Sequence, residues 1–259
     1  MTRQRRIVYT GLLILFTILM SYIPGLGIVD LTSIIPGAGL LKQAPFDVAH
    51  GVVTVLLITT ALVAQLRAPE AKIAALQQIA VCVIGLLAVE AAGRDLEVFA
   101  LPEILAIGFL GVLVPLHPAR ATFLDRGLVS YPILGVACAG AVPLLIYAVK
   151  MSAHTLAHLP PYPGATEDGP SDWLNFSGAA VGIALVALLS ALRTKGWRIP
   201  AWSAGLGSMV LGLEWIIHPS SPGSEPAAMA FLAIMWGVVL VATAEWQALR
   251  DRTIKAAIK

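Results

Sequence analysis

The chain has 259 residues, of which 58% are hydrophobic and only 12% are charged, and its mean hydropathy is +0.85. This composition is too apolar for a soluble domain, so a lipid bilayer must be the solvent for most of the surface. The formal net charge is only +2 and the basic residues form no dense cluster, which argues against a nucleic-acid partner.

Eight apolar stretches approach the roughly 20 residues that an α-helix needs to cross a bilayer. They are far too long for barrel strands, and a spanning backbone must pair its own polar groups, which leaves helices. The sequence therefore predicts an all-α integral membrane protein, a polytopic bundle of about eight transmembrane helices in one domain, residues 1–259. The expected spans are 7–29, 46–66, 72–92, 100–117, 128–150, 173–192, 200–218 and 226–247.

The basic residues predict the orientation of these spans, because cytoplasmic loops are enriched in Lys and Arg. All but three of the 17 basic residues fall on one side of the eight-span arrangement, the exceptions being Lys42, Arg94 and Lys150. We therefore expect both termini in the cytoplasm, and the first span to act as an uncleaved start signal. The short loops favour a prokaryotic inner membrane.

The eight-span arrangement also assigns each of the five histidines to the outer or the inner half of the membrane. His50, His154, His158 and His218 map to the outer half, and only His117 maps to the inner half. His117 stands at a helix end between Leu116 and Pro118, where we expect an interfacial residue or a C-terminal cap. The outer face is therefore where the sequence places a functional site.

Residues three or four apart share a helix face, and three such pairs occur on the outer side. They are Asp47 with His50, Glu214 with His218, and His154 with His158, the last pair continuing a stripe from Lys150. Glu90 adds a carboxylate near the outer end of the third span. Pro143 predicts a kink in the fifth span below the histidine stripe.

These residues lead to the hypothesis of a Zn- or Cu-type metal site formed by His50, His154, His158 and His218. Imidazole suits such metals, and Asp47, Glu90 and Glu214 would act as further ligands, as residues that orient the imidazoles, or as catalytic bases. A metal-dependent hydrolase or a metal-handling factor would fit. The sequence lacks H-E-x-x-H, G-x-S-x-G, a phosphate-binding P-loop and a dinucleotide-binding glycine motif, so it indicates no particular reaction.

Two other functions remain open at this point. The chain fits a structural or accessory membrane subunit without any cofactor, paired with a membrane-protein partner or with a second copy of itself. It also fits a haem b electron-transfer protein, in which His50 with His154 or His218 would supply the axial ligands. A transporter is less favoured, because the central thirds of the spans contain no acid or base. The proline-rich loop 159–172 either covers the outer site or links two spans as a solvated segment.

Overall fold

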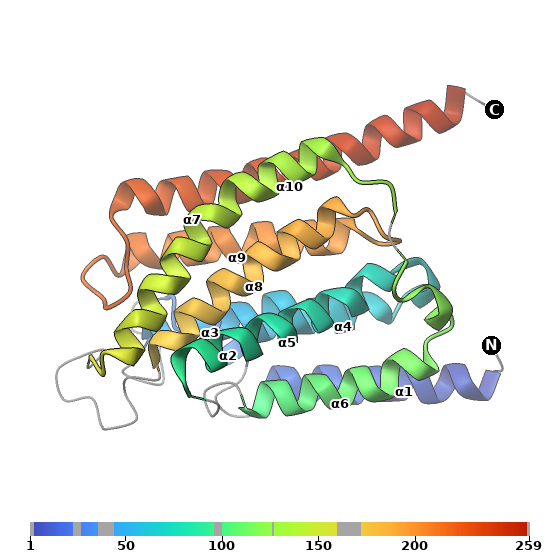
Figure 1. The fold of residues 1–259 in the computed structure, drawn as a ribbon. Coiled ribbons are helices and arrows are strands. Elements are labelled where there is room, and N and C mark those ends of the chain that lie inside the picture. Colours follow the sequence, from blue (N-terminus) through green and yellow to red (C-terminus); the bar gives the residue numbers. More distant parts are fainter. Residues whose placement is uncertain are drawn as a thin grey trace.

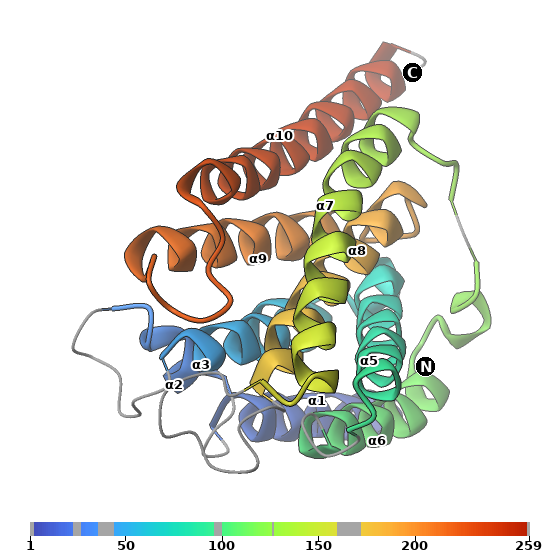
Figure 2. The same ribbon diagram turned by 60° about the vertical axis from the view of Figure 1, so that its left-hand side comes forward.

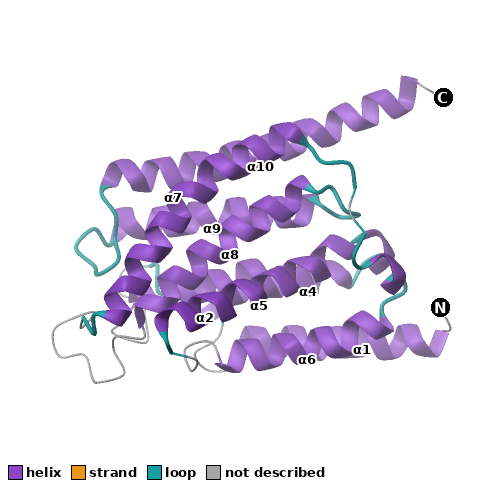
Figure 3. Cartoon of the chain, viewed as in Figure 1, coloured by secondary structure: helices purple, strands orange, loops and turns teal. Residues whose placement is uncertain are grey.

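The computed structural model describes residues 3–22, 27–35, 44–95, 100–125, 127–159 and 172–257. These residues form helices and no strand (Figure 3). The elements are α1 (Arg3–Tyr22), α2 (Ile28–Thr32), α3 (Ala44–Gly51), the π-helix η1 (Val52–Thr59), α4 (Thr60–Gln65), η2 (Pro69–Ala71), α5 (Ile73–Gly93), α6 (Ala100–Leu116), η3 (Arg120–Thr122), α7 (Tyr131–Leu156), α8 (Trp173–Ala191), α9 (Arg198–Ile217) and α10 (Ala227–Ala257). The 159–172 loop lies almost wholly outside the described residues.

The protein is an all-helical, multi-pass membrane protein. Five helical segments are long and apolar enough to cross a bilayer: Phe46–Gln65, Ile73–Gly93, Tyr131–Leu156, Trp173–Ala191 and Ala227–Ile254. The segment Glu103–Leu116 is a shorter apolar helix. Two further expected stretches overlap α1 and α9, which are not among these five segments; α1 ends at Tyr22, short of the expected 7–29.

The long helices lie in stacked layers around α8, which packs against α5, α7 and α9 (Figure 1). The start of α1 and the end of α10 lie at the same end of the bundle. We call this the inner end, after the predicted orientation, and the opposite end the outer end. Helix α8 is the most buried span, whereas α7 and α10 lie at the edge and expose many apolar side chains, as lipid contact allows.

Small residues bring α9 and α10 close together. A Cβ atom on Gly237 would overlap the carbonyl oxygen of Gly205, and one on Gly212 would lie 2.6 Å from the carbonyl oxygen of Ala230. Helices in lipid associate through close packing of this kind, because burial from water does not drive them together. Close van der Waals packing of these small residues therefore holds α9 and α10 together.

Helix α7 contacts α10 near its own start and diverges from it toward the outer end, as Figures 1 and 2 both show. Pro143 lies inside α7, as the sequence indicated. Its ring nitrogen cannot donate the helical hydrogen bond to the carbonyl of Ala139, which weakens the helix at this level. The divergence leaves space between the outer halves of α7 and α10.

Candidate functional site

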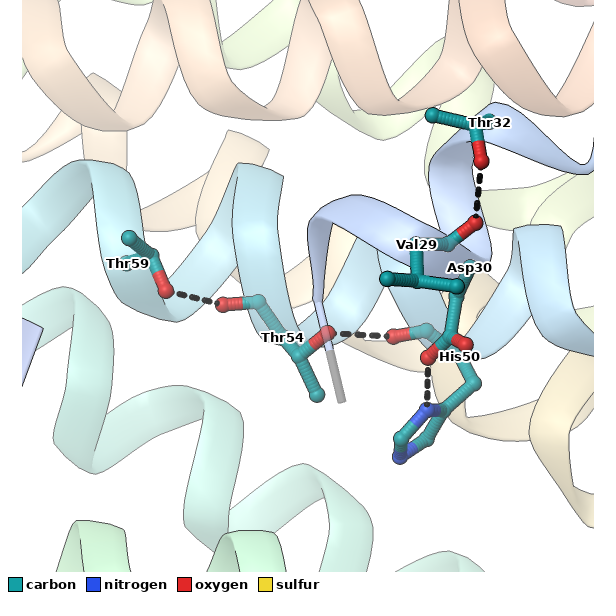
Figure 4. Close-up of polar contacts among 6 residues, drawn as sticks. All are labelled: Val29, Asp30, Thr32, His50, Thr54 and Thr59. Atoms are coloured by element: carbon teal, nitrogen blue, oxygen red, sulfur yellow. Dashed lines mark hydrogen bonds and ion pairs between the residues drawn. The ribbon is translucent and has the colours of Figure 1, made fainter. Parts of the chain in front are cut away.

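An aspartate–histidine pair lies at the outer end of the second span (Figure 4). The Nδ1 atom of His50, in α3, is 2.8 Å from Oδ2 of Asp30, in α2. The side chain of Asp30 is only 3% exposed and that of His50 is 14% exposed. Because a carboxylate only accepts, Nδ1 carries the proton and donates it, and in the neutral ring the lone pair is on Nε2.

Two glycines position α2, Gly27 against the end of α1 and Gly51 against α3. Gly27 precedes α2 with a φ of +89°, a conformation that favours glycine, and a Cβ there would lie 2.8 Å from the carbonyl oxygen of Met20. Gly51 follows His50 directly, and a Cβ on it would lie 2.9 Å from the backbone nitrogen of Leu31 and 3.1 Å from Cβ of Asp30. The pair therefore depends on backbone contact between the two helices.

Two further carboxylates lie near the pair. Asp47 is hydrogen-bonded to Ser33 and is close enough to Asp30 and His50 for their charges to act on it. Its Oδ2 atom is buried without a hydrogen-bond partner. Burial raises the pKa of Asp172, the residue before α8, to about 6, and the charge of Asp47 adds to this shift. Asp30 and Asp47 thus lie near one imidazole and Asp172 lies near Asp47, which brings three carboxyl groups to this end of the bundle.

The helix below His50 is widened into the π-helix η1. The hydroxyl of Thr54 donates to the carbonyl of His50 at 3.0 Å, and that of Thr59 donates to the carbonyl of Thr54 at 2.8 Å (Figure 4). Threonine hydroxyls that bond to backbone carbonyls of earlier turns compete with the regular α-helical pattern. Departures into π-helix are found frequently at functional sites, which directs attention to His50.

The other predicted histidines lie apart from this arrangement. His154 packs against the indole of Trp173, with ring centroids 4.7 Å apart. Helix α7 ends at Leu156, and His158 beyond it is exposed with a φ of +50°. The expected stripe of Lys150, His154 and His158 is therefore interrupted, because the helix does not reach its last member.

Glu214 and His218 are neighbours, as their spacing predicted, with 3.9 Å between Oε2 and Nε2. The Glu214 side chain is 1% exposed, and neither of its carboxyl oxygens has a hydrogen-bond partner. A buried carboxyl group in this position is costly, so it is a second place where chemistry is expected.

Glu90 is hydrogen-bonded to Glu103, which lies in the first turn of α6. Both residues are buried. A hydrogen bond between two carboxyl groups requires a proton on one of them, because an ionised carboxylate can only accept. The two acids therefore share one proton. Glu90 thus lies between α5 and α6 in a pair of its own.

His117 is buried at the inner end and takes no part in the outer site. It follows α6 directly and is only 1% exposed, so protein surrounds its side chain at this helix end. Its ring nitrogens contact Gln65, Pro69 and Ala119.

Within the part of the chain that the structure describes, no three His, Cys, Asp or Glu side chains gather where they would hold a metal ion. Helix α8 lies between α3 and α7 and packs against both, which separates His50 from His154. Sequence reasoning missed Asp30 as the partner of His50, because 20 residues separate them and no helical spacing relates them. The glycine at position 51 was the local signal, since it allows another backbone to approach.

Comparison of the chain with known protein families, with curated proteins and with solved structures found no match.

Proposed function

We propose that the protein crosses a prokaryotic inner membrane eight times, with both termini in the cytoplasm, and binds a Zn- or Cu-type metal ion at its outer face. The ligands in this proposal are His50, Asp47 and Asp172, with Asp30 orienting the imidazole. The asymmetric distribution of Lys and Arg supports the orientation.

The observation that carries the metal proposal is the hydrogen bond between His50 and Asp30, with the carboxyl groups of Asp47 and Asp172 nearby. A histidine that binds a metal usually donates its other ring N–H to a carboxylate, and Asp30 accepts such a bond from His50. The nearby charges of Asp47 and Asp172 repel each other, and a cation would relieve that repulsion. Binding requires the two acids to turn toward His50.

The test is metal binding by the full chain, purified in detergent without chelators. Metal content is measured by elemental analysis, and Zn²⁺ and Cu²⁺ affinities by calorimetry. We expect about one ion per chain, at least tenfold weaker binding in His50→Ala and Asp47→Asn, and no change in the control His158→Ala. This control removes an outer histidine that is exposed and lies beyond the end of α7.

Equal binding by wild type and His50→Ala would overturn the proposal, and so would a wild type that binds neither ion. An absorption spectrum on the same sample distinguishes haem, because a Soret band that is lost in His50→Ala would support the haem b alternative.

A further inference from the structure

A groove lies between the outer halves of α7, α9 and α10. It encloses about 450 Å³ and is lined mainly by apolar side chains, among them Leu144, Met229, Leu232 and Ala233. Ile146 and Leu232, on opposite walls, are 66% and 61% exposed. The groove therefore opens sideways, between two helices that face lipid.

The groove has the depth of one membrane leaflet. Trp236 closes it at the inner end, where its indole donates to the carbonyl of Val136 at 2.7 Å and occupies the space above Gly140. Lys150 stands at the outer end, ten residues further along α7, which is about 15 Å of helix. This equals about half of the roughly 30 Å hydrocarbon core, so the cavity fits the acyl region of the outer leaflet.

The outer mouth carries both signs of charge. Nζ of Lys150 is 2.7 Å from Oε1 of Glu225, and their side chains are 51% and 17% exposed. The loop that bears Glu225 is tied down, because the hydroxyl of Tyr147 donates to the carbonyl of Gly223 at 2.7 Å. The hydroxyl of Ser224 likewise donates to the carbonyl of His218 at 2.7 Å. Cation and anion are therefore held at fixed positions at headgroup depth.

We propose that the groove binds one zwitterionic phospholipid of the outer leaflet, such as phosphatidylethanolamine. One acyl chain lies in the groove against Leu144 and Leu232 and ends at Trp236. The lipid phosphate takes the place of Glu225 beside Lys150, and the lipid ammonium group takes the place of Lys150 beside Glu225. The Lys150–Glu225 ion pair is thus replaced by two ion pairs, Lys150 with the phosphate and Glu225 with the ammonium group. A headgroup that carries only a phosphate charge would leave Glu225 unpaired.

The test is native mass spectrometry of the full chain in detergent, titrated with phosphatidylethanolamine or with phosphatidylglycerol of the same acyl composition. We expect tighter binding of phosphatidylethanolamine. Ala139→Phe fills the groove and should weaken binding of this lipid about tenfold or more. Val142→Phe is the matched control, because Val142 is exposed on α7 but does not line the groove.

Lys150→Ala should weaken binding of both lipids, since each has a phosphate, whereas Glu225→Gln should weaken only phosphatidylethanolamine. Equal binding of the two lipids by wild type would overturn the headgroup assignment. Equal binding by Ala139→Phe and Val142→Phe would overturn the groove itself. Circular dichroism of each variant establishes that its helices have formed.

Discussion

The Nε2 atom of His117 lies 3.2 Å from the side-chain oxygen of Gln65, and this contact determines which ring nitrogen carries the proton. Nε2 also lies 3.1 Å from the carbonyl oxygen of Pro69, so it faces two acceptors and must donate. Nδ1 accepts from the backbone N–H of Ala119 at 3.0 Å. A neutral ring satisfies all three contacts, and a second proton on Nδ1 would break one of them.

The first prediction concerns stability against acid. Burial lowers the pKa of His117 below its usual value of 6.5, so below this pH the unfolded state binds more protons than the folded state. The contribution of His117 to the free energy of unfolding should therefore be constant above about pH 6.5. It should fall as the pH drops below that value. Thermal unfolding in detergent between about pH 8 and pH 5 measures this decline.

The variant for this test is His117→Gln, which cannot take up a proton and should show a smaller decline on acidification. His158→Gln is the control, because His158 is exposed at the opposite end, and it should keep the wild-type decline. The same pH dependence in wild type and His117→Gln would contradict the assignment.

The second prediction concerns the contact between α9 and α10. Gly237→Ala should destabilise the protein by about 1–3 kcal/mol, because the new methyl group meets the backbone of Gly205, which cannot move aside. Gly111→Ala, in α6, should be neutral or stabilising by up to about 1 kcal/mol, since nothing lies within 4 Å of its Cβ position. Unfolding of both variants by denaturant gives the comparison, and equal stability would argue against close packing here.

The third prediction links the backbone of α2 to the proposed metal. Gly51→Ala places a methyl group against Leu31 and Asp30, which should move Asp30 away from His50. Loss of a carboxylate that orients a ligand typically costs about 10–100-fold in metal affinity. Calorimetry with Zn²⁺ should show this loss in Gly51→Ala and in Asp30→Asn. Gly108→Ala, with open space at its Cβ, should bind as wild type does.

The fourth prediction concerns the paired acids Glu90 and Glu103. Glu103→Gln should be tolerated, because an amide N–H replaces the shared proton in the hydrogen bond to Glu90. Glu103→Ala should destabilise by about 1–3 kcal/mol, since it leaves a buried carboxyl group without this partner. Thermal unfolding of the two variants at one pH tests this, and Glu103→Gln should unfold at the higher temperature. If Glu103→Gln were the less stable of the two, the shared proton would be ruled out.

The fifth prediction concerns the orientation in the membrane. In a background with Cys82→Ala and Cys138→Ala, a cysteine at Ser220 should react with a membrane-impermeant maleimide in intact cells. A cysteine at Arg252 should react only after the membrane is opened. Both positions are exposed, one in the loop between α9 and α10 and the other near the end of α10. The reverse pattern would invert the proposed topology.

Much of the fold could be predicted from local sequence. Hydropathy locates apolar runs of about 20 residues from the local sequence alone, and most of the expected stretches contain a long helix in the structure. The spacing of Glu214 and His218 likewise predicted a contact, because one helix turn brings them together whatever the rest of the chain does.

The details of the second span were less accessible. Residues 46–66 are predicted as one span, and the structure builds this span from three consecutive helical segments, α3, η1 and α4. The threonines at 54 and 59 contribute to the widening through hydrogen bonds to backbone carbonyls, and such bonds are optional for threonine in a helix.

Local sequence is enough to predict a multi-pass helical membrane protein with histidines concentrated toward one end, because hydropathy and helix periodicity act over short distances along the chain. Three features could not be predicted in this way: Asp30 pairs with His50, α8 separates His50 from His154, and α7 and α10 leave a groove between them. Each of these depends on how helices distant in sequence pack, which is set by glycine contacts such as those at Gly51 and Gly205 and by the path of α7 at Pro143.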